Sequence, residues 1–186
     1  LQSTEAKARL GSDGRLVVST AASDIGTGTW TILAQIGADA LGLPVDLVTV
    51  KIGESALPTS PVEGGSWTAA SAGSAVQAAC DNVKRELFMH AKKMANSPLA
   101  DAKFEDVDFR FGRIALSSDS DRGLSIDEVM HAADIDHIEE TGKVGPDLLQ
   151  MRKYVSYTHS VVFAEVCVDE DLDIIKVTRI VCATAA

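Results

Sequence analysis

Residues 16–43, "LVVSTAASDIGTGTWTILAQIGADALGL", contain a strand pattern, a glycine-rich loop and a helix pattern in direct succession. The helix pattern stops at Gly42, which Pro44 follows closely. Its apolar residues recur at the three-to-four spacing of one helix face: Ile32, Leu33, Ile36, Ala40 and Leu41. The loop between the two elements is "DIGTGT", residues 24–29. A GxG turn after a strand and before a helix lets backbone N–H groups approach an anion closely.

Further strand and helix patterns extend over most of the chain. Three hairpin patterns occur, at residues 6–20, 106–118 and 159–185. The other patterns are a short strand at 47–53, a loop at 57–67, a long Ala-rich helix at 68–94 and a short helix at 125–133. Residues 134–157 have no clear periodicity, so they predict a loop with at most one short strand.

This order of elements predicts an α+β fold, a two-layer sandwich in which helices pack on a mainly antiparallel sheet. The length suits one domain over residues 1–186, with subdomains at 1–98 and 99–186. The chain starts without Met and ends inside a strand pattern, so we expect it to be part of a longer protein. The helix residues expected to face the sheet are Leu33, Ile36, Leu41, Val76, Val83 and Leu87.

Composition excludes several classes of function. The net charge of −10 repels phosphate backbones, so a nucleic acid partner is not expected. No apolar run approaches the roughly 20 residues of a membrane span. Three isolated cysteines without CxxC spacing, Cys80, Cys167 and Cys182, favour reduced, buried thiols over disulfides or a zinc site. The four histidines also lack metal-ligand spacing, and we expect no metal site: His90, His131, His137 and His159.

Two glycine-rich loops precede the two longest helix patterns. The first holds Gly26, Thr27, Gly28 and Thr29, and the second runs from Gly64 to Thr68. Together their amides and hydroxyl groups predict a site for a large polar ligand. The alternative is structural, because glycines often form turns and Ser or Thr often cap helices. The third glycine of a Rossmann motif and the lysine of a P-loop are both missing.

Three separated motifs together carry a resemblance to a known family. They are "DIGTGTWTILAQIGADALGLPVDLVTVKIGES", "LPTSPVEGGSWTAASAGSAVQAAC" and "HSVVFAEVCVDEDLDIIKVTRIV". In this order and spacing they resemble the molybdopterin-binding large subunit of the xanthine dehydrogenase and aldehyde oxidase family. The resemblance implies a molybdenum hydroxylase that oxidises an aldehyde or N-heterocycle with oxygen taken from water. It also implies partner subunits or domains that carry iron–sulfur clusters and FAD.

The resemblance assigns residues of both loops to the pyranopterin and its phosphates. Thr27 stands where animal xanthine oxidases carry glutamine, which is similar to the bacterial aldehyde-oxidase-like branch. That branch implies the cytosine dinucleotide form of the cofactor. It also implies a cytoplasmic enzyme, or one exported to the periplasm with a partner that carries the signal. The cofactor-binding residues implied are Gly26, Thr27, Gly28, Thr29, Gly65, Ser66, Trp67 and Thr68.

The catalytic glutamate of the family has no counterpart here. It belongs to a Gly-Glu motif that does not follow the last strand pattern, so we expect no catalytic residue in this chain and no activity from it alone. We interpret Glu63 as a loop carboxylate and Glu165 as a solvent-facing strand residue. An alternative function is a stand-alone domain that keeps the fold for interaction or assembly.

Overall fold

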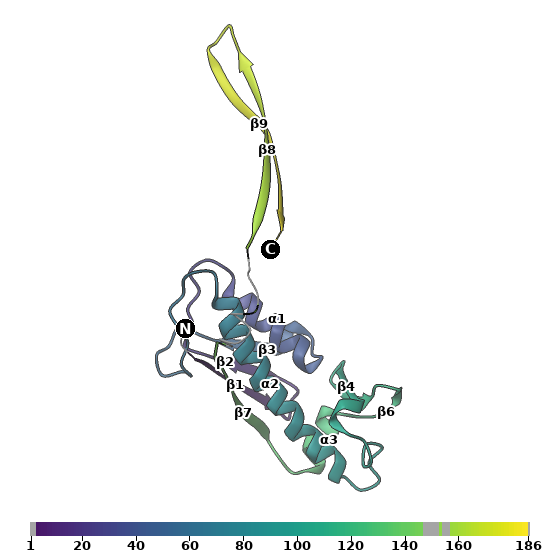
Figure 1. The fold of residues 1–186 in the computed structure, drawn as a ribbon. Coiled ribbons are helices and arrows are strands. Elements are labelled where there is room, and N and C mark those ends of the chain that lie inside the picture. Colours follow the sequence, from purple (N-terminus) through teal and green to yellow (C-terminus); the bar gives the residue numbers. More distant parts are fainter. Residues whose placement is uncertain (1–2, 147–152, 154–156, 186) are drawn as a thin grey trace. The chain divides into compact units, whose positions relative to one another are not determined.

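The computed structural model describes residues 3–146, 153 and 157–185. The chain consists of two compact units, residues 1–146 and residues 147–186. Figure 1 shows the elements of both. Each unit is considered by itself below.

A four-stranded sheet in the order β3-β2-β1-β7 forms the centre of the first unit. Its strands are β1 (Thr4–Gly11), β2 (Leu16–Ser19), β3 (Val48–Lys51) and β7 (His137–Val144). Strand β1 pairs antiparallel with β2 and β7, whereas β2 pairs parallel with β3. The sheet is therefore mixed and mainly antiparallel, and the α+β prediction is confirmed.

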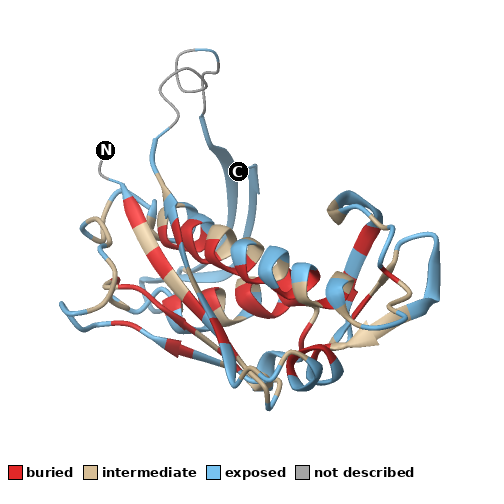
Figure 2. Cartoon of the chain, turned by 90° about the horizontal axis from the view of Figure 1, so that it is seen from below, coloured by how far each residue is buried: buried red, intermediate tan, exposed pale blue. Residues whose placement is uncertain are grey.

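Two long helices pack together on this sheet, α1 (Thr29–Leu41) and α2 (Thr68–Lys93). In Figure 2 the buried residues concentrate along these helices and the strands below them. Five of the six helix residues expected to face the sheet are at most 1% exposed. Ile36 is only partly buried, and its side chain lies against Gly73 of α2. Gly42 ends α1 in the left-handed conformation at φ +62°, as the sequence predicts.

Small residues let α2 lie very close to β1 and β7. Ala72, Ala75 and Ala79 of the helix are fully buried, as are Ala6 and Ala8 of β1. Opposite Ala6 in the sheet, a Cβ atom on Gly142 would lie 2.5 Å from the carbonyl oxygen of Ala75 and would also strike the amide of Ala79. The Ala-rich sequence of α2 therefore reflects its distance from the sheet as well as helix propensity.

A smaller sheet completes the first unit. Strands β4 (Val107–Arg110), β5 (Arg113–Leu116) and β6 (Asp119–Ser125) precede the helix α3 (Ile126–Ala132). The capping box at Ser125 and Glu128 is confirmed, since each side chain contacts the other residue's backbone amide. Two short 3-10 helices, η1 (Val45–Leu47) and η2 (Phe104–Asp106), precede β3 and β4.

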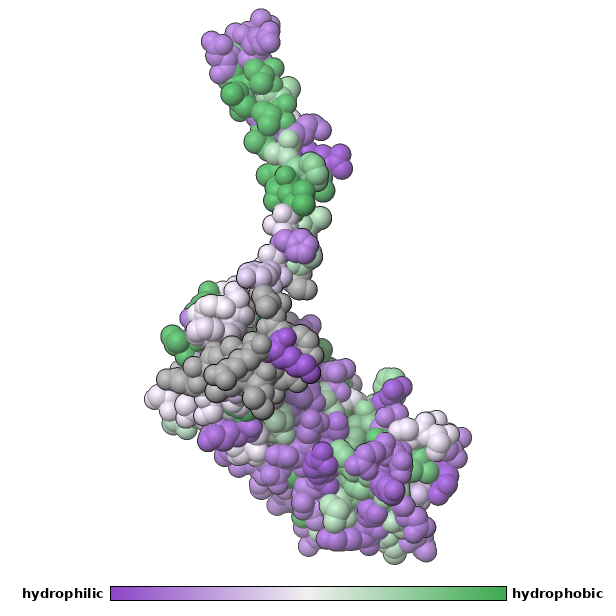
Figure 3. Space-filling model, in the orientation of Figure 1, coloured by the Kyte–Doolittle hydropathy of each residue, from purple (hydrophilic) through white to green (hydrophobic). Residues whose placement is uncertain are grey.

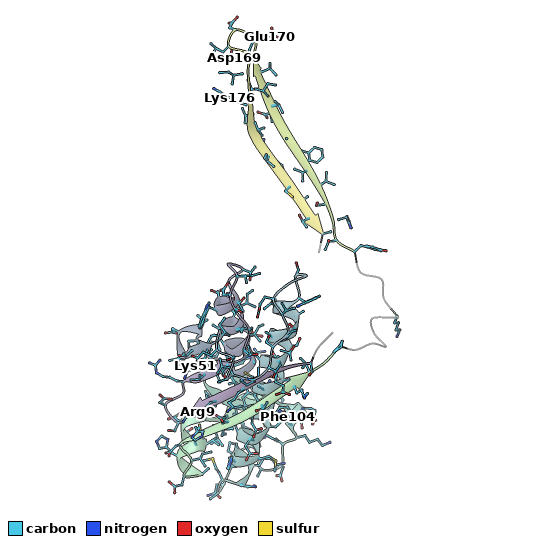
Figure 4. All side chains as sticks on the ribbon, turned by 90° about the vertical axis from the view of Figure 1, so that its left-hand side faces the viewer. Arg9, Lys51, Phe104, Asp169, Glu170 and Lys176 are labelled. Atoms are coloured by element: carbon cyan, nitrogen blue, oxygen red, sulfur yellow. The ribbon has the colours of Figure 1, made fainter. Side chains whose placement is uncertain are left out.

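The second unit is a long hairpin of β8 (His159–Asp169) and β9 (Ile174–Ala185), as predicted. One of its faces carries no charged side chain. Figure 3 shows apolar residues along much of the hairpin, with hydrophilic residues at the turn and in between. Figure 4 shows Asp169, Glu170 and Lys176 at the turn end. The members of the uncharged face are Ser160, Val162, Ala164, Val166, Val168, Ile175, Val177, Ile180, Cys182 and Thr184.

The prediction of buried thiols is correct for Cys80 and wrong for the other two cysteines. Cys80 is fully buried in α2, and this burial raises the pKa of its thiol to about 12. Cys167 and Cys182 are exposed, because the described hairpin packs against no second layer of its own unit. All three thiols are free.

Candidate functional site

The parallel pairing of β2 and β3 brings the two glycine-rich loops together. The first loop (residues 20–28) leaves the carboxyl end of β2, and the second loop (residues 57–67) follows β3. Because the carboxyl ends of parallel strands meet at one edge of a sheet, both loops and the helices after them begin at the same edge. The loops then run side by side, with the amide of Ala21 donating to the carbonyl of Pro58 at 2.7 Å.

Asp24 organises the first loop. Its Oδ1 accepts the amides of Gly26 at 2.8 Å, Thr27 at 3.1 Å and Gly28 at 3.3 Å. These bonds, that of Gly26 most of all, lower the pKa of the Asp24 carboxyl below its ordinary value of 3.8. The two glycines have positive φ angles of +96° and +78°. Three amides that the sequence offers to an external anion are therefore already bonded to a carboxylate of the same chain.

Two threonine hydroxyl groups and the first turn of α1 complete the first loop. The Oγ1 atoms of Thr27 and Thr29 lie 3.4 Å apart, and Thr29 is buried. Helix α1 begins after Gly28, which has no side chain to cap it. The backbone amide of Trp30 in its first turn instead interacts with the Asp24 carboxylate and helps to lower the pKa of that group. Its first helical bond joins the amide of Ile32 to the carbonyl of Gly28. The loop therefore presents the exposed hydroxyl group of Thr27, whereas the Thr29 hydroxyl is buried and the first turn of α1 already interacts with Asp24.

The second loop is closed by its own tryptophan. Trp67 donates its indole N–H to the carbonyl of Val62 at 2.8 Å. A Cβ atom on Gly65 would lie 2.9 Å from the indole ring, so only glycine fits beside it. Gly65 and Ser66 both have positive φ, +58° and +59°, which is uncommon for serine. The structure therefore holds residues 62–67 in a compact, partly strained turn.

Helix α2 begins directly after this turn without a side-chain cap. Trp67 is its N-cap residue, and the first helical bond joins the amide of Ser71 to the carbonyl of Trp67 at 2.8 Å. The amides of Thr68, Ala69 and Ala70 have no hydrogen-bond partner within the described ranges. An uncapped N-terminus of a 26-residue helix attracts an anion through its free amides and its partial positive charge.

Glu63 joins the two loops. Its Oε1 accepts the backbone amide of Ser23 at 2.7 Å, although the two residues lie 40 positions apart. Its place in the loop is as interpreted from the sequence, but the bond was not foreseen. Glu165 is exposed on β8, where its Oε1 accepts the hydroxyl of Thr178 at 2.7 Å. Asp24 and Glu63 are therefore the two site residues that sequence reasoning missed.

Two of the four histidines lie on helices of the first unit, outside these loops. His90 Nε2 is 3.2 Å from Glu86 on α2, and His131 Nδ1 is 2.8 Å from the carbonyl of Asp127. No group of three His, Cys, Asp or Glu side chains among the described residues is arranged to hold a metal ion. In the same part of the chain, no helix is long and apolar enough to cross a membrane.

Three open cavities of about 680, 330 and 350 Å³ lie in the first unit. The first is lined by residues of α1, α2 and β4, and the other two lie along residues 53–60. None of the three includes Gly26–Thr29 or Gly65–Thr68. Most residues of the glycine turns are exposed, and the cavity of about 350 Å³ borders the start of the first loop at Ala21 and Ser23.

Comparison with known proteins places this surface in context. The family model of the molybdopterin cofactor-binding domain matches residues 1–186. The aldehyde oxidoreductase molybdenum-binding subunit PaoC of Escherichia coli K12 is 42% identical over 91 residues, which are 49% of this chain and 12% of PaoC. The chain thus matches about an eighth of that relative's length.

Solved structures share the fold. Quinoline 2-oxidoreductase from Pseudomonas putida 86 has a TM-score of 0.78 at 24% identity, over 98% of this chain and 23% of that one. Carbon monoxide dehydrogenase from Oligotropha carboxidovorans has a TM-score of 0.75 at 20% identity, over 97% and 22%. With the family match over its full length, the chain belongs to the molybdopterin cofactor-binding domain family.

Proposed function

We propose that this chain forms one part of the cofactor cradle in a molybdenum hydroxylase that oxidises an aldehyde or an N-heterocycle. The observation that carries the proposal is the uncapped N-terminus of α2, which lies beside the first loop at one edge of the sheet. The name of the E. coli relative, an aldehyde oxidoreductase molybdenum-binding subunit, supports the type of reaction.

The donors at this edge suit a polyanionic pterin cofactor. The free amides of Thr68, Ala69 and Ala70 are neutral, as are the hydroxyl groups of Ser66 and Thr68. In a chain with a net charge of −10, such preorganised dipoles stabilise phosphate without a cluster of lysines. When bound, the cofactor supplies the molybdenum chemistry of hydroxylation, and the chain's own residues hold and orient it.

The first loop contributes through its hydroxyl groups and its shape. The Asp24 carboxylate accepts the amides of Gly26, Thr27 and Gly28, so the exposed Thr27 hydroxyl is the donor proposed to face the pterin. The buried Thr29 hydroxyl, 3.4 Å from it, is proposed to support it. Gly65 and Trp67 set the shape of the second loop. We assign cofactor binding to the eight residues that the sequence indicated, and the cytosine dinucleotide form is part of this proposal.

The remaining parts of the enzyme are also proposals. Electrons would leave through iron–sulfur and FAD partners, and the catalytic base would come from a part of the large subunit beyond this segment. A cytoplasmic location is proposed, with export beside a signal-bearing partner as the other route. The alternative of a stand-alone interaction domain predicts that loop substitutions leave cofactor content unchanged.

Hydroxyl deletion in the full-length subunit tests the proposal. Thr68→Ala removes one donor from the α2 N-terminus, and a hydrogen bond to a charged group contributes about 1.5–3 kcal/mol. We expect a partly loaded enzyme whose rate per bound molybdenum stays near normal. Ser74→Ala is the matched control, because this exposed hydroxyl lies farther along the same helix. Full molybdenum content in Thr68→Ala would contradict the proposal.

A further inference from the structure

The two loops are held together differently at their base and near their glycine turns. At the base, backbone bonds join Ala21 to Pro58 at 2.7 Å, and the amide of Gly53 to the carbonyl of Ala22 at 2.7 Å. The Thr20 hydroxyl adds a bond to the Pro58 carbonyl at 3.3 Å. Past Ala22, no backbone bond joins the loops in the described part of the chain. Beyond that point, the hydrogen bond from the Ser23 amide to Glu63 Oε1 joins the two loops.

This bond connects two segments that are each closed by hydrogen bonds of their own. Ser23 directly precedes Asp24, whose carboxylate fixes residues 26–28. Glu63 lies inside the turn that Trp67 closes on Val62. Bonds within each turn define its shape, and the Glu63–Ser23 bond is the hydrogen bond that joins the two turns among the described residues. We propose that Glu63 is a positioning residue that sets the distance between the two cofactor-binding loops.

The chemistry of the contact distinguishes this role from catalysis. Glu63 Oε1 accepts the backbone N–H of Ser23, and the Glu63 side chain is partly buried. Its role in this contact is that of a hydrogen-bond acceptor. Its negative charge is unfavourable beside an anionic ligand. The amide oxygen of glutamine accepts the same bond without the charge. A positioning role is therefore rescued by glutamine, whereas a role that needs a carboxylate is not.

The inference rests on the proposed function, and its test uses the full-length subunit. Glu63→Ala should lose molybdenum about tenfold faster than the unaltered enzyme, the effect of one charge-assisted hydrogen bond. Hydrogen exchange at the Ser23 amide should accelerate in the same variant. Glu63→Gln should restore both cofactor retention and Ser23 protection. Glu54→Ala, an exposed carboxylate in the same connection between β3 and α2, should match the unaltered enzyme.

Two results would overturn the inference. The first is molybdenum retention in Glu63→Ala equal to that of the unaltered enzyme, and the second is equal loss in the Gln and Ala variants. Thr68→Ala separates this failure from that of the proposed function. Loss in Thr68→Ala with full retention in Glu63→Ala refutes only the positioning role, and full retention in both refutes the cofactor site as well. If Glu63→Ala does not fold, the Gln variant alone decides, since loss of cofactor there contradicts the inference.

Discussion

At the scale of single residues, two carboxylates shape the loops without belonging to the expected donor set. Asp24 lies two to four positions before the amides it accepts, a spacing typical of Asp in local turns. The sequence contains enough information to predict that contact. The bond of Glu63 to Ser23 spans 40 positions and depends on the parallel pairing of β2 with β3, so local pattern could not reveal it.

The first residue-scale prediction concerns pH. Because the folded-state pKa of Asp24 lies below its ordinary 3.8, its bonds to the loop are complete above that value and are lost as pH falls through the folded pKa. An NMR titration should show the Gly26 amide shift following a midpoint below 3.8. Asp24→Asn keeps an oxygen acceptor and should abolish this transition. A midpoint at or above 3.8 would contradict the assignment.

The second prediction concerns Gly28, whose φ is +78°. Valine there is strained by about 1–2 kcal/mol, and its side chain enters the surface proposed to face phosphate. Gly14→Val is the matched control, since Gly14 has φ +75°, lies in the β1–β2 turn, and a Cβ atom added at either glycine would meet no other atom within 4 Å. Both variants should lose similar stability in thermal unfolding. Only Gly28→Val should lose molybdenum and activity together. If this variant keeps both, the loop serves only as the turn that leads into α1, and its proposed cofactor role is wrong.

At the scale of elements, periodicity predicted both long helices and all three hairpins, but it failed for two strands. Strand β7 has eight residues where at most one short strand was expected, and charges and Gly142 hide its alternation. Strand β6, "DSDRGLS", has no apolar alternation because it is largely exposed. Strand pairing depends on tertiary contacts such as Ala6 with Gly142, which local periodicity does not contain.

The close approach of α2 to the sheet gives the third prediction. Gly142→Ala places a methyl group against the backbone of Ala75 and Ala79, which cannot move aside as a flexible side chain can. We expect destabilisation of about 3 kcal/mol, at the upper end for overpacking. Gly145→Ala, three positions later with nothing within 4 Å, should change stability by less than about 0.5 kcal/mol. Equal unfolding temperatures for the two variants would contradict this account of α2.

At the scale of the whole molecule, two features stand out, the acidic net charge and the exposed apolar face of the hairpin. The proposed hydrogen-bond donors on the first unit are neutral amides and hydroxyl groups, whereas the whole chain has a net charge of −10. On the second unit, the uncharged face of the hairpin is open, with Val162 59% and Ile180 64% exposed. Exposed apolar surface of this kind is typical of sites that contact other protein or a membrane. Composition gives the net charge of the whole chain. Only the strand register shows that one face of the hairpin has no charged side chain.

The final prediction is that residues 1–186 alone do not retain molybdenum. The proposed donors lie on an open surface outside the three cavities, and the matched segment is 12% of the E. coli relative. An anionic cofactor held from one side, by a chain of the same charge sign, should dissociate quickly. The purified chain should be incubated with cofactor-containing extract, separated by gel filtration and analysed for molybdenum. The full-length subunit treated alike is the positive control. About one molybdenum per isolated chain would show that these two loops suffice to hold the cofactor. The expectation that other parts of the subunit must enclose it would then be refuted.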